Sequence, residues 1–576
     1  MDQYSNGALK DLSQSKHTPC SDRGNGFRLR SQTSARRSNQ SLPQHSKKLY
    51  NALWQSKITY SRDENKSFIP YEKLELAKDD ALVEQALRHP SSGISKSQVP
   101  ILLKRICSNH KPSFFRIFAI LVLCKNVRYI AKFIDLQVDD SYLPLPTIRR
   151  TENGITPWLH KHGPKLNRET LEDIFQDEDD WDHGNLSTFN TCQWWTIAPF
   201  FDRLDNEIPH YLLEANDVFP FTKKKEVKTE SLDTDVEELI KEGGFGEVSI
   251  VEIHPSHHGF ADQLYNDGSH SFAIKRLKSP SAGDFKLEVD ALRKYNYGIE
   301  NHLIPLLATI EKDDDAGKYY MLFPKADGDL HHFWKTQFSQ KTDGSLLRWM
   351  AKQCLGLTEA LSMLHQDQDA DKEEDYPIYG RHGDIKAANI LWFSKRGVTG
   401  SSGWCLVLAD FGLMRFHRLW SRSIQTARNL KKTITYQAPE FDIAKISRKS
   451  DIWALGCTFL EFVTCYLLGY QAVNEDFPTR RGEYDERLKL DADKFYRTTN
   501  GGEWAELKPS VQEWISNLHQ NPNCSPYLHD FLFFIEKSML CIERDKRPTA
   551  SKVAQELKSL YEKCEKDSYV SGRILP

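Results

Sequence analysis

The sequence predicts an α+β protein with more than one domain, and three observations support this. The chain has 576 residues, which corresponds to two to four domains at roughly 100 to 200 residues each. Apolar residues recur at helical spacing between Leu49 and about Glu230. Past residue 235, strand-like alternation comes first and helical patterns such as Leu347 to Leu364 follow. We therefore expect a helix-rich module followed by a mixed region of strands and helices.

Composition excludes several classes of protein. Apolar residues make up 39% of the chain and charged residues 27%, so it is neither wholly disordered nor collagen-like. The net charge of -3 gives no sign that a nucleic acid is the main partner. The 11 cysteines are odd in number and scattered, without CxxC or HExxH spacing. Neither a disulfide framework nor a structural zinc is therefore indicated, and a reducing cell interior fits best.

Targeting and membrane signals are also missing from the sequence pattern. The longest apolar run, Ile117 to Cys124, is far shorter than the ~20 residues that cross a bilayer, and we expect it to be a buried helix. No apolar segment follows a basic head near Met1, so we do not expect a secretory peptide. The expected location is cytoplasmic, or nuclear if the basic run Lys223 to Lys225 acts as an address rather than as solvated surface.

Two regions precede the strand-like part of the chain. Residues 1–48 hold nine Lys and Arg against three Asp and few large apolar groups, which predicts a disordered basic tail. Residues 49–230 are predicted to be a helix-rich module, with helical spacing from Leu74 to the stop at Pro90. Their second half carries an acidic patch, Asp177 to Asp180, and a set of aromatic residues: Trp194, Trp195, Phe200, Phe201, Tyr211 and Phe221. We interpret these rings as packing residues rather than a platform for bases, because basic residues are not interleaved with them.

The first signal of phosphate chemistry is a glycine-rich turn between two strand-like stretches, Ile240 to Val248. Glycine lacks a Cβ, so backbone N–H groups in such a turn can approach phosphate oxygens, although a plain structural hairpin is the alternative. Further on, Ser271 to Lys275 alternates as a strand does and ends in a lysine that needs an anionic partner. Nucleotide phosphates and Glu288, which lies in a helical pattern, are the two candidates.

Two later motifs carry the strongest signal, His382-Gly383-Asp384-Ile385-Lys386-Ala387-Ala388-Asn389 and Asp410-Phe411-Gly412. With these motifs and the preceding ones in this order, the sequence resembles the eukaryotic protein kinases of the serine/threonine type. Ala438-Pro439-Glu440, the stretch that begins at Asp451, and Arg547-Pro548-Thr549 extend the resemblance, which covers residues 231–564 and leaves 565–576 as a C-terminal tail. It implies a two-lobed protein kinase fold, strand-rich to about Phe323 and helical beyond, with ATP between the lobes. The N-terminal extension resembles those of uncharacterised fungal kinases.

The resemblance also implies roles for individual residues. Asp384 would accept the proton of the substrate hydroxyl, and Lys386 would reach the transferred phosphate. Asn389 and Asp410 would hold Mg²⁺ against the phosphate oxygens. The residues expected to bind ATP are Ile240, Lys241, Gly243, Gly244, Gly246, Val248, Lys275 and Glu288. Lys275 would contact phosphates while Glu288 orients it, Arg547 would pair with Glu440, and Asp451 would brace the catalytic loop.

Some positions define the subclass or depart from the family pattern. Lys386 and Thr433 are typical of kinases that phosphorylate serine or threonine in protein substrates. Lys241 stands where the first glycine of the loop usually lies, yet Gly243 and Gly246 are retained, so we expect ATP binding to persist. Gly383 replaces the arginine that commonly precedes the catalytic aspartate, so we do not expect switching through an ion pair between that arginine and a phosphate.

Several alternatives stay open at this level. A pseudokinase could bind nucleotide only as a scaffold, and the module at 49–230 could be an interaction device or serve a regulatory partner. The basic residues between Phe411 and Pro439 are interpreted as a solvated loop or as a docking site for acidic substrates. The acidic run 366–375 is predicted to be a surface loop rather than a calcium site. The insertion from about Val251 to His270 holds His254, His257 and His258 and is predicted to be an exposed loop rather than a metal site.

Overall fold

The computed structural model describes most of the chain from residue 46 to residue 571. The described ranges are 46–60, 63–151, 154–158, 166–204, 207–222, 241–242, 246–260, 270–279, 281–294, 302–314, 317–338, 344–365, 381–395, 403–410, 434–443, 446–485, 488–499 and 503–571. Residues 1–45 of the predicted basic tail lie outside them, whereas its last three residues, 46–48, are helical. Also outside the described ranges are Ile240, Gly243, Gly244, Thr433 and the runs 366–375 and 411–433.

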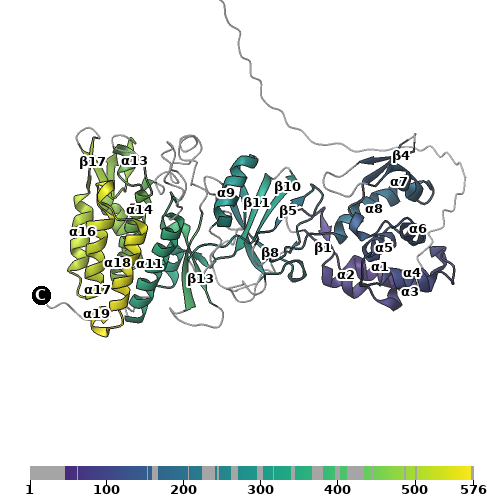
Figure 1. Cartoon of the computed structure of the whole chain (residues 1–576), viewed down its shortest axis with the longest axis horizontal. Coiled ribbons are helices and arrows are strands. Elements are labelled where there is room, and N and C mark those ends of the chain that lie inside the picture. The colour runs from purple at the N-terminus through teal and green to yellow at the C-terminus, as the bar shows by residue number, and fades with distance from the viewer. Residues whose placement is uncertain are drawn as a thin grey trace, which may run out of the picture. The chain divides into compact units, whose positions relative to one another are not determined.

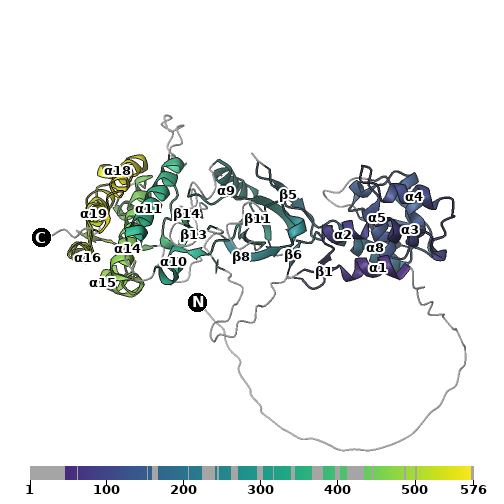
Figure 2. The same ribbon diagram turned by 90° about the horizontal axis from the view of Figure 1, so that it is seen from below.

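The N-terminal part is helical, as the spacing of its apolar residues predicts. Its helices are α1 (Ser46–Gln55), α2 (Tyr71–Ala77), α3 (Asp80–Leu87), α4 (Val99–Ile106), α5 (Phe115–Leu123), α6 (Ile130–Asp135), α7 (Arg168–Phe175) and α8 (His183–Thr196). Strands β1 (Ile58–Thr59) and β2 (Ser67–Phe68) pair with each other, as do β3 (Thr147–Thr151) and β4 (Gly154–Trp158). The apolar run predicted to be a buried helix is α5, which the other helices surround (Figures 1 and 2). Its amino end is capped by Asp140, whose carboxylate accepts the N–H groups of Arg116 and Ile117.

A seven-stranded sheet follows, in the order β5-β10-β11-β9-β8-β6 with β7 paired to β8. Its strands are β5 (His210–Leu213), β6 (Phe221–Thr222), β7 (Lys241–Glu242), β8 (Gly246–Ile253), β9 (Ser271–Leu277), β10 (Ala308–Asp314) and β11 (Gly317–Pro324). Helix α9 (Ala282–Lys294) lies beside this sheet (Figure 1). The expected strands on both sides of the glycine-rich turn are β7 and β8, which pair with Lys241 opposite Val248.

The boundary predicted at residue 230 does not coincide with the edge of the sheet. β5 and β6 precede it, yet β5 pairs in parallel with β10, and β6 pairs with β8. Most of the aromatic residues that we interpreted as packing residues are buried. Phe200 is the exception to that prediction, because it is 37% exposed. Phe201, Phe221 and Phe272 share one hydrophobic core, so Phe201 and Phe221 pack as part of the sheet although they precede residue 230.

The histidines of the insertion are not on an exposed loop, and the prediction for them is wrong. His257 is fully buried and His258 is 5% exposed. The His257 ring stacks on Tyr71 with ring centroids 4.2 Å apart, its Nδ1 donates to the Pro199 carbonyl, and its Nε2 accepts the backbone N–H of Tyr71. These contacts join α2 to the turn Pro255–His257, so the insertion is an attachment point for the helical module.

The remaining part of the chain is a helical lobe. Its helices are α10 (Leu330–Thr336), α11 (Gly344–His365), α13 (Glu440–Ile443), α14 (Lys449–Leu468), α15 (Phe477–Arg481), α16 (Pro509–His519), α17 (Pro526–Phe534), α18 (Ala550–Lys563) and α19 (Asp567–Ser571), with the π-helical turn η14 (Ile535–Met539) after α17. Strands β12 (Gly328–Asp329), β13 (Ile390–Ser394) and β14 (Trp404–Leu408) form a small sheet. Two hairpins, β15 (Glu483–Asp485) with β16 (Leu490–Ala492) and β17 (Tyr496–Thr499) with β18 (Trp504–Leu507), precede α16.

Helix α14 forms the centre of this lobe, and α11 and α18 pack nearby (Figures 1 and 2). Among the described residues, α14 is long and apolar enough to cross a membrane by length and composition, but 94% of that stretch is buried inside the protein. A helix that is apolar on every side is expected at the core of a large lobe.

Burial of His257 predicts a stability that depends on pH. Burial, outweighing the carbonyl of Pro199, lowers the pKa of His257 to about 4, and burial lowers that of His258 likewise to about 4. In the unfolded chain a histidine titrates near 6.5, so below that pH the unfolded state binds more protons and folding is disfavoured. The contribution is fully present above pH 6.5 and is lost as the pH falls toward 4, by up to about 3 kcal/mol for each ring.

We expect His257→Gln to lower stability at pH 7.5 and to reduce the fall in stability between pH 6.5 and 4.5, while His258 and the other buried histidines with a lowered pKa, such as His382, still titrate. Thermal unfolding across this pH range measures both effects. The control is His110→Gln, at an exposed position, which should leave the slope unchanged. An unchanged slope in His257→Gln would contradict the prediction.

Candidate functional site

Lys275 lies at the centre of the first group of predicted site residues. It is in β9, 7% exposed, and its Nζ lies 2.7 Å from Oε1 of Glu288 in α9 and 2.9 Å from Oδ1 of Asp410. Burial alone would lower the pKa of Lys275, but the carboxylates of Asp410 and Glu288 outweigh burial and raise it. In the same way burial would raise the pKa of Asp410, and Lys275 holds it below its usual range. Lys275 and Asp410 are therefore charged together, with Glu288 within hydrogen-bond distance of the ammonium group.

Strand pairing places Gly246 and Val248, which follow the glycine-rich turn, beside this lysine. Val248 in β8 is directly opposite Lys275 in β9. A Cβ at Gly246 would lie 2.8 Å from the carbonyl oxygen of Arg276 and 3.2 Å from Cε of Lys275. Glycine is required at 246 by this close approach of two strands. Lys241 contributes backbone pairing at the other side of the turn.

The second group surrounds Asp384. Its Oδ2 accepts hydrogen bonds from Nζ of Lys386 at 2.6 Å and from Nδ2 of Asn389 at 2.8 Å. Nδ2 of Asn389 also donates to the backbone carbonyl of Asp384. Within the described residues, Oδ1 of Asp384 accepts no hydrogen bond, so one carboxylate oxygen is held in place and the other is available to accept a proton.

The β13–β14 hairpin brings the two groups together. Ile390 is paired with Leu408, so Asn389 and Ala409 lie side by side, and the N–H of Ala409 donates to the carbonyl of Asn389. Asp410, the next residue, has a φ of 65°. This left-handed conformation is strained for a residue with a Cβ, and such strain is typical of functional sites.

Asp451, at the start of α14, supports the loop from below. Its Oδ2 accepts the N–H of His382 at 2.8 Å, and its Oδ1 accepts the N–H of Gly383 at 2.9 Å. Gly383 has a φ of 85°, which glycine adopts without strain. Burial would raise the pKa of Asp451, but His365, whose Nε2 lies 2.9 Å away, lowers it. The carboxylate that holds the loop thus stays ionised.

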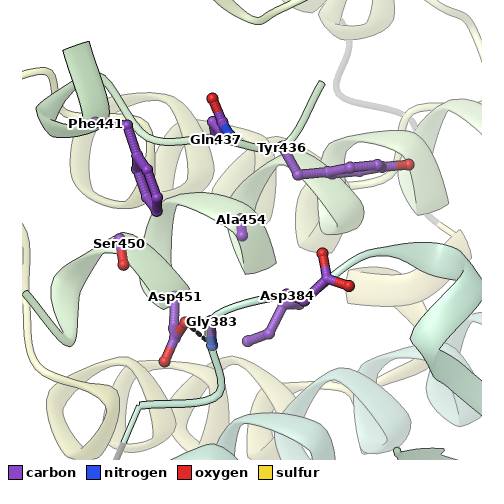
Figure 3. Close-up of a pocket in the computed structure, with 9 residues that line it drawn as sticks. Gly383, Asp384, Tyr436, Gln437, Phe441, Ser450, Asp451 and Ala454 are labelled. Carbon is purple, nitrogen blue, oxygen red and sulfur yellow. Dashed lines mark hydrogen bonds between the residues drawn. The ribbon is translucent and has the colours of Figure 1, made fainter. Parts of the chain in front are cut away.

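Asp384 also lines a small pocket. Figure 3 shows Gly383, Asp384 and Asp451 along one wall and Tyr436, Gln437 and Phe441 along the other. The Tyr436 hydroxyl donates to Oε2 of Glu461, and Arg481 lies 3.2 Å from Oε1 of the same glutamate. The local sequence gives little indication of this network beyond Glu461, an acid within the apolar helix α14.

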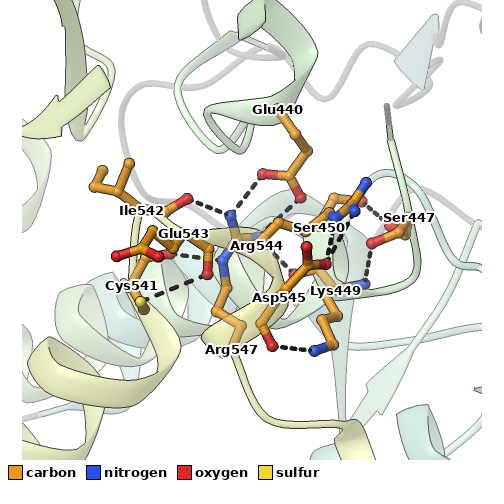
Figure 4. Close-up of polar contacts among 10 residues, drawn as sticks. All are labelled: Glu440, Ser447, Lys449, Ser450, Cys541, Ile542, Glu543, Arg544, Asp545 and Arg547. Carbon is orange, nitrogen blue, oxygen red and sulfur yellow. Dashed lines mark hydrogen bonds and ion pairs between the residues drawn. The ribbon is translucent and has the colours of Figure 1, made fainter. Parts of the chain in front are cut away.

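The expected pair between Arg547 and Glu440 is present and buried. Two parallel contacts of 2.9 and 2.6 Å join the guanidinium to the carboxylate. The other donors of Arg547 reach the carbonyls of Cys541, Ile542 and Lys449 (Figure 4). Its five N–H groups are therefore all used, and the role of the pair is to fix α13 to the start of α14.

The residues predicted from sequence thus gather in two adjoining groups. Gly246, Val248, Lys275, Glu288 and Asp410 form the first, and Asp384, Lys386 and Asn389 form the second. The side-chain oxygens of Asp410 and Asn389 are hard ligands that suit a divalent cation such as Mg²⁺. The amide nitrogen of Asn389 already donates to Asp384, so its amide oxygen is the atom that would bind the cation. For phosphate, Lys275 uses two of its three N–H donors within the described residues, which leaves one for an anionic ligand.

Comparison with known proteins agrees with this geometry. Residues 258–557 match the family model of the protein kinase domain. Two receptor-like protein kinases of Arabidopsis thaliana are 25% identical over 303 residues and 26% identical over 289 residues, which cover 51% and 49% of this chain and 30% and 24% of the relatives. A probable LRR receptor-like serine/threonine-protein kinase of the same plant is 27% identical over 227 residues, 39% of this chain and 22% of its own. The chain spans less than a third of the length of each relative.

The buried pair of Arg547 and Glu440 predicts that two arginines of this lobe differ in how much they contribute to stability. Arg547→Ala should lower the free energy of unfolding by about 3 to 5 kcal/mol, because it leaves the Glu440 carboxylate buried without its partner. The matched control is Arg497→Ala, whose partner Glu506 is 48% exposed and whose loss should change stability by less than about 1 kcal/mol. Chemical denaturation measures both variants, and equal losses would contradict the prediction.

Proposed function

Because the chain belongs to the protein kinase family, we propose that it transfers the γ-phosphoryl group of Mg-ATP to serine or threonine hydroxyls of protein substrates. The single observation that carries this proposal is that the group around Lys275 adjoins the group around Asp384. One presents a buried cation, and the other presents a carboxylate with one oxygen fixed and one free. Phosphoryl transfer needs mainly positioning and charge stabilisation, which these groups supply.

Each side chain has a defined task in this proposal. Lys275, held by Glu288, binds phosphate oxygens with its remaining N–H. Oδ1 of Asp384 accepts the hydroxyl proton while Lys386 and Asn389 hold Oδ2, which fixes the orientation of the carboxylate. Lys386 lies two residues after Asp384 and offers a cation to the transferred group, which supports the serine/threonine class. When bound by Asp410 and Asn389, Mg²⁺ would neutralise charge on the phosphate oxygens.

The assignment of a catalytic base makes a direct prediction. Asp384→Asn should lower kcat for peptide phosphorylation by about 100-fold or more with little change in ATP affinity, because it removes the proton acceptor. Asp410→Ala should also abolish transfer. Radiolabelled phosphate incorporation with the purified chain measures both, and Asp491→Asn, at an exposed position, is the control. A parent protein that binds Mg-ATP but incorporates no phosphate would favour the alternative of a pseudokinase scaffold.

For the N-terminal module we propose a regulatory role. Support comes from the contacts of His210 in β5. The ring centroids of His210 and Phe285, a residue of α9, are 6.0 Å apart. Nδ1 of His210 lies 3.0 Å from Oγ1 of Thr309. Phe285 in turn stacks on Tyr319 at 4.4 Å. Because Glu288 is on the same helix, one turn beyond Phe285, contacts at Phe285 bear on the pair between Glu288 and Lys275.

A cavity in the module supports the proposal of a regulatory partner. It measures about 500 Å³ and its lining includes Lys66, Arg149, His183 and Trp194 but no acidic side chain. Its size is that of a ligand site, and its charge suits an anionic ligand or acidic segment. The likeness of residues 49–230 to fungal kinase extensions, and a cytoplasmic or nuclear location, stay predictions.

The role of β5 can be tested without truncating the chain. His210→Ala should lower kcat several-fold, up to about tenfold, because α9 loses a lateral contact and the Lys275–Glu288 pair is less well held. His210→Phe, which keeps a ring against Phe285, should recover most of the activity. Leu212→Ala, at a 47% exposed position on the same strand, is the control. Steady-state kinetics measures kcat for each variant. Full activity of His210→Ala would exclude coupling between His210 and the Lys275–Glu288 pair.

A further inference from the structure

Three potential metal ligands meet in the helical lobe at residues that the proposed catalysis does not use. His519 is the last residue of α16, Cys524 lies in the turn that follows, and His529 is in the first half of α17. One ligand atom from each of the three side chains lies within 4.8 Å of the other two. Cys524 is 3% exposed, so solvent is largely excluded from its sulfur. None of the three lines the pocket at Asp384.

The two imidazoles face each other through their nitrogens. Nδ1 of His519 is 2.8 Å from Nδ1 of His529, the ring centroids are 5.0 Å apart, and the rings are inclined by only 21°. Nearly coplanar rings at this distance meet at their edges rather than face to face. At most one of these nitrogens can carry the proton of a direct hydrogen bond, so at least one lone pair points into the space between the rings. Within the described residues, the Cys524 thiol makes no hydrogen bond of its own.

Local hydrogen bonds hold the three ligands in place. The N–H of Cys524 donates to the carbonyl of Asn521 at 2.9 Å, which fixes the turn. Ser525 caps α17 by accepting the N–H of Leu528, and the N–H of His529 donates to the carbonyl of Ser525. The spacing His-x4-Cys-x4-His is thus presented by a helix end, a tight turn and a capped helix start, so little ordering is required for binding.

We propose that His519, Cys524 and His529 form a zinc site, with Nδ1, Sγ and Nδ1 as protein ligands and water in the fourth position. Imidazole nitrogen and thiolate sulfur are the ligands that Zn²⁺ prefers. Tetrahedral bonds of about 2.0 to 2.3 Å separate neighbouring ligand atoms by about 3.3 to 3.7 Å, so the two nitrogens need to move apart by only about 0.5 Å. The ion would join α16 to α17 across their connecting turn.

The sequence alone does not indicate structural zinc, because it has neither paired cysteines nor HExxH. A cluster with one cysteine between two histidines is recognised only when the fold brings them together.

Metal binding by the full chain tests the proposal. The protein is stripped with EDTA, Zn²⁺ alone is added back, and bound metal is measured by elemental analysis after desalting. We expect one zinc per chain, and a raised unfolding temperature in the presence of zinc. Co²⁺ in place of zinc should give the visible bands of a tetrahedral site and a thiolate charge-transfer band, which a catalytic site of Asp410 and Asn389 cannot give.

Matched variants assign the ligands. Cys524→Ser and His519→Gln should each weaken zinc binding by about 100-fold or more and remove the cobalt bands, whereas Cys541→Ser, at a partly exposed cysteine outside the cluster, should keep both. If Cys524→Ser does not fold, His519→Gln and the cobalt spectrum of the parent protein still decide. Absence of bound zinc in the parent protein, or equal binding in His519→Gln, would show that the two histidines share only a hydrogen bond.

Discussion

The arrangement of the site depends on one interaction, the pairing of the buried Lys275 ammonium group with the carboxylates of Glu288 and Asp410. A lysine that is 7% exposed stays charged only where carboxylates offset its loss of hydration. Glu288 comes from α9 and Asp410 from the end of β14, so the sheet, its helix and the hairpin must all be in place together. Two carboxylates around one cation leave a net negative charge, which suits a site where a divalent cation and phosphates are bound together.

The catalytic loop has a different kind of support, because it is attached to the most rigid part of the helical lobe. Asp451 belongs to α14, which is buried along most of its length, and both of its oxygens accept backbone N–H groups from the loop. Arg547 and Glu440 fix the neighbouring α13 in the same core. The backbone that precedes Asp384 is therefore held by Asp451, while the side chains of Lys386 and Asn389 orient the Asp384 carboxylate.

The roles predicted for the site residues stay predictions, whereas the architecture around them was predicted less well for a physical reason. Asp384, Lys386 and Asn389 lie within a few residues of each other, and their chemistry requires those side chains at that spacing. The burial of His257, the place of β5 in the sheet and the contact between His519 and His529 depend on pairings between distant segments or across a turn. Strand partners and helix junctions are fixed by the packed structure, and no local pattern encodes them.

The same long-range pairings change how residues before 230 should be understood. β5 and β6 occupy both outer positions of the path through the sheet, next to β10 and β8, so the chain preceding the glycine-rich turn covers strand edges that would otherwise be open. His257 ties the helical module to this sheet through both of its ring nitrogens. Strand pairing connects β5 to β10, and the contact between His210 and Phe285 connects β5 to α9. Because α9 carries Glu288, the module has a continuous physical path to Lys275.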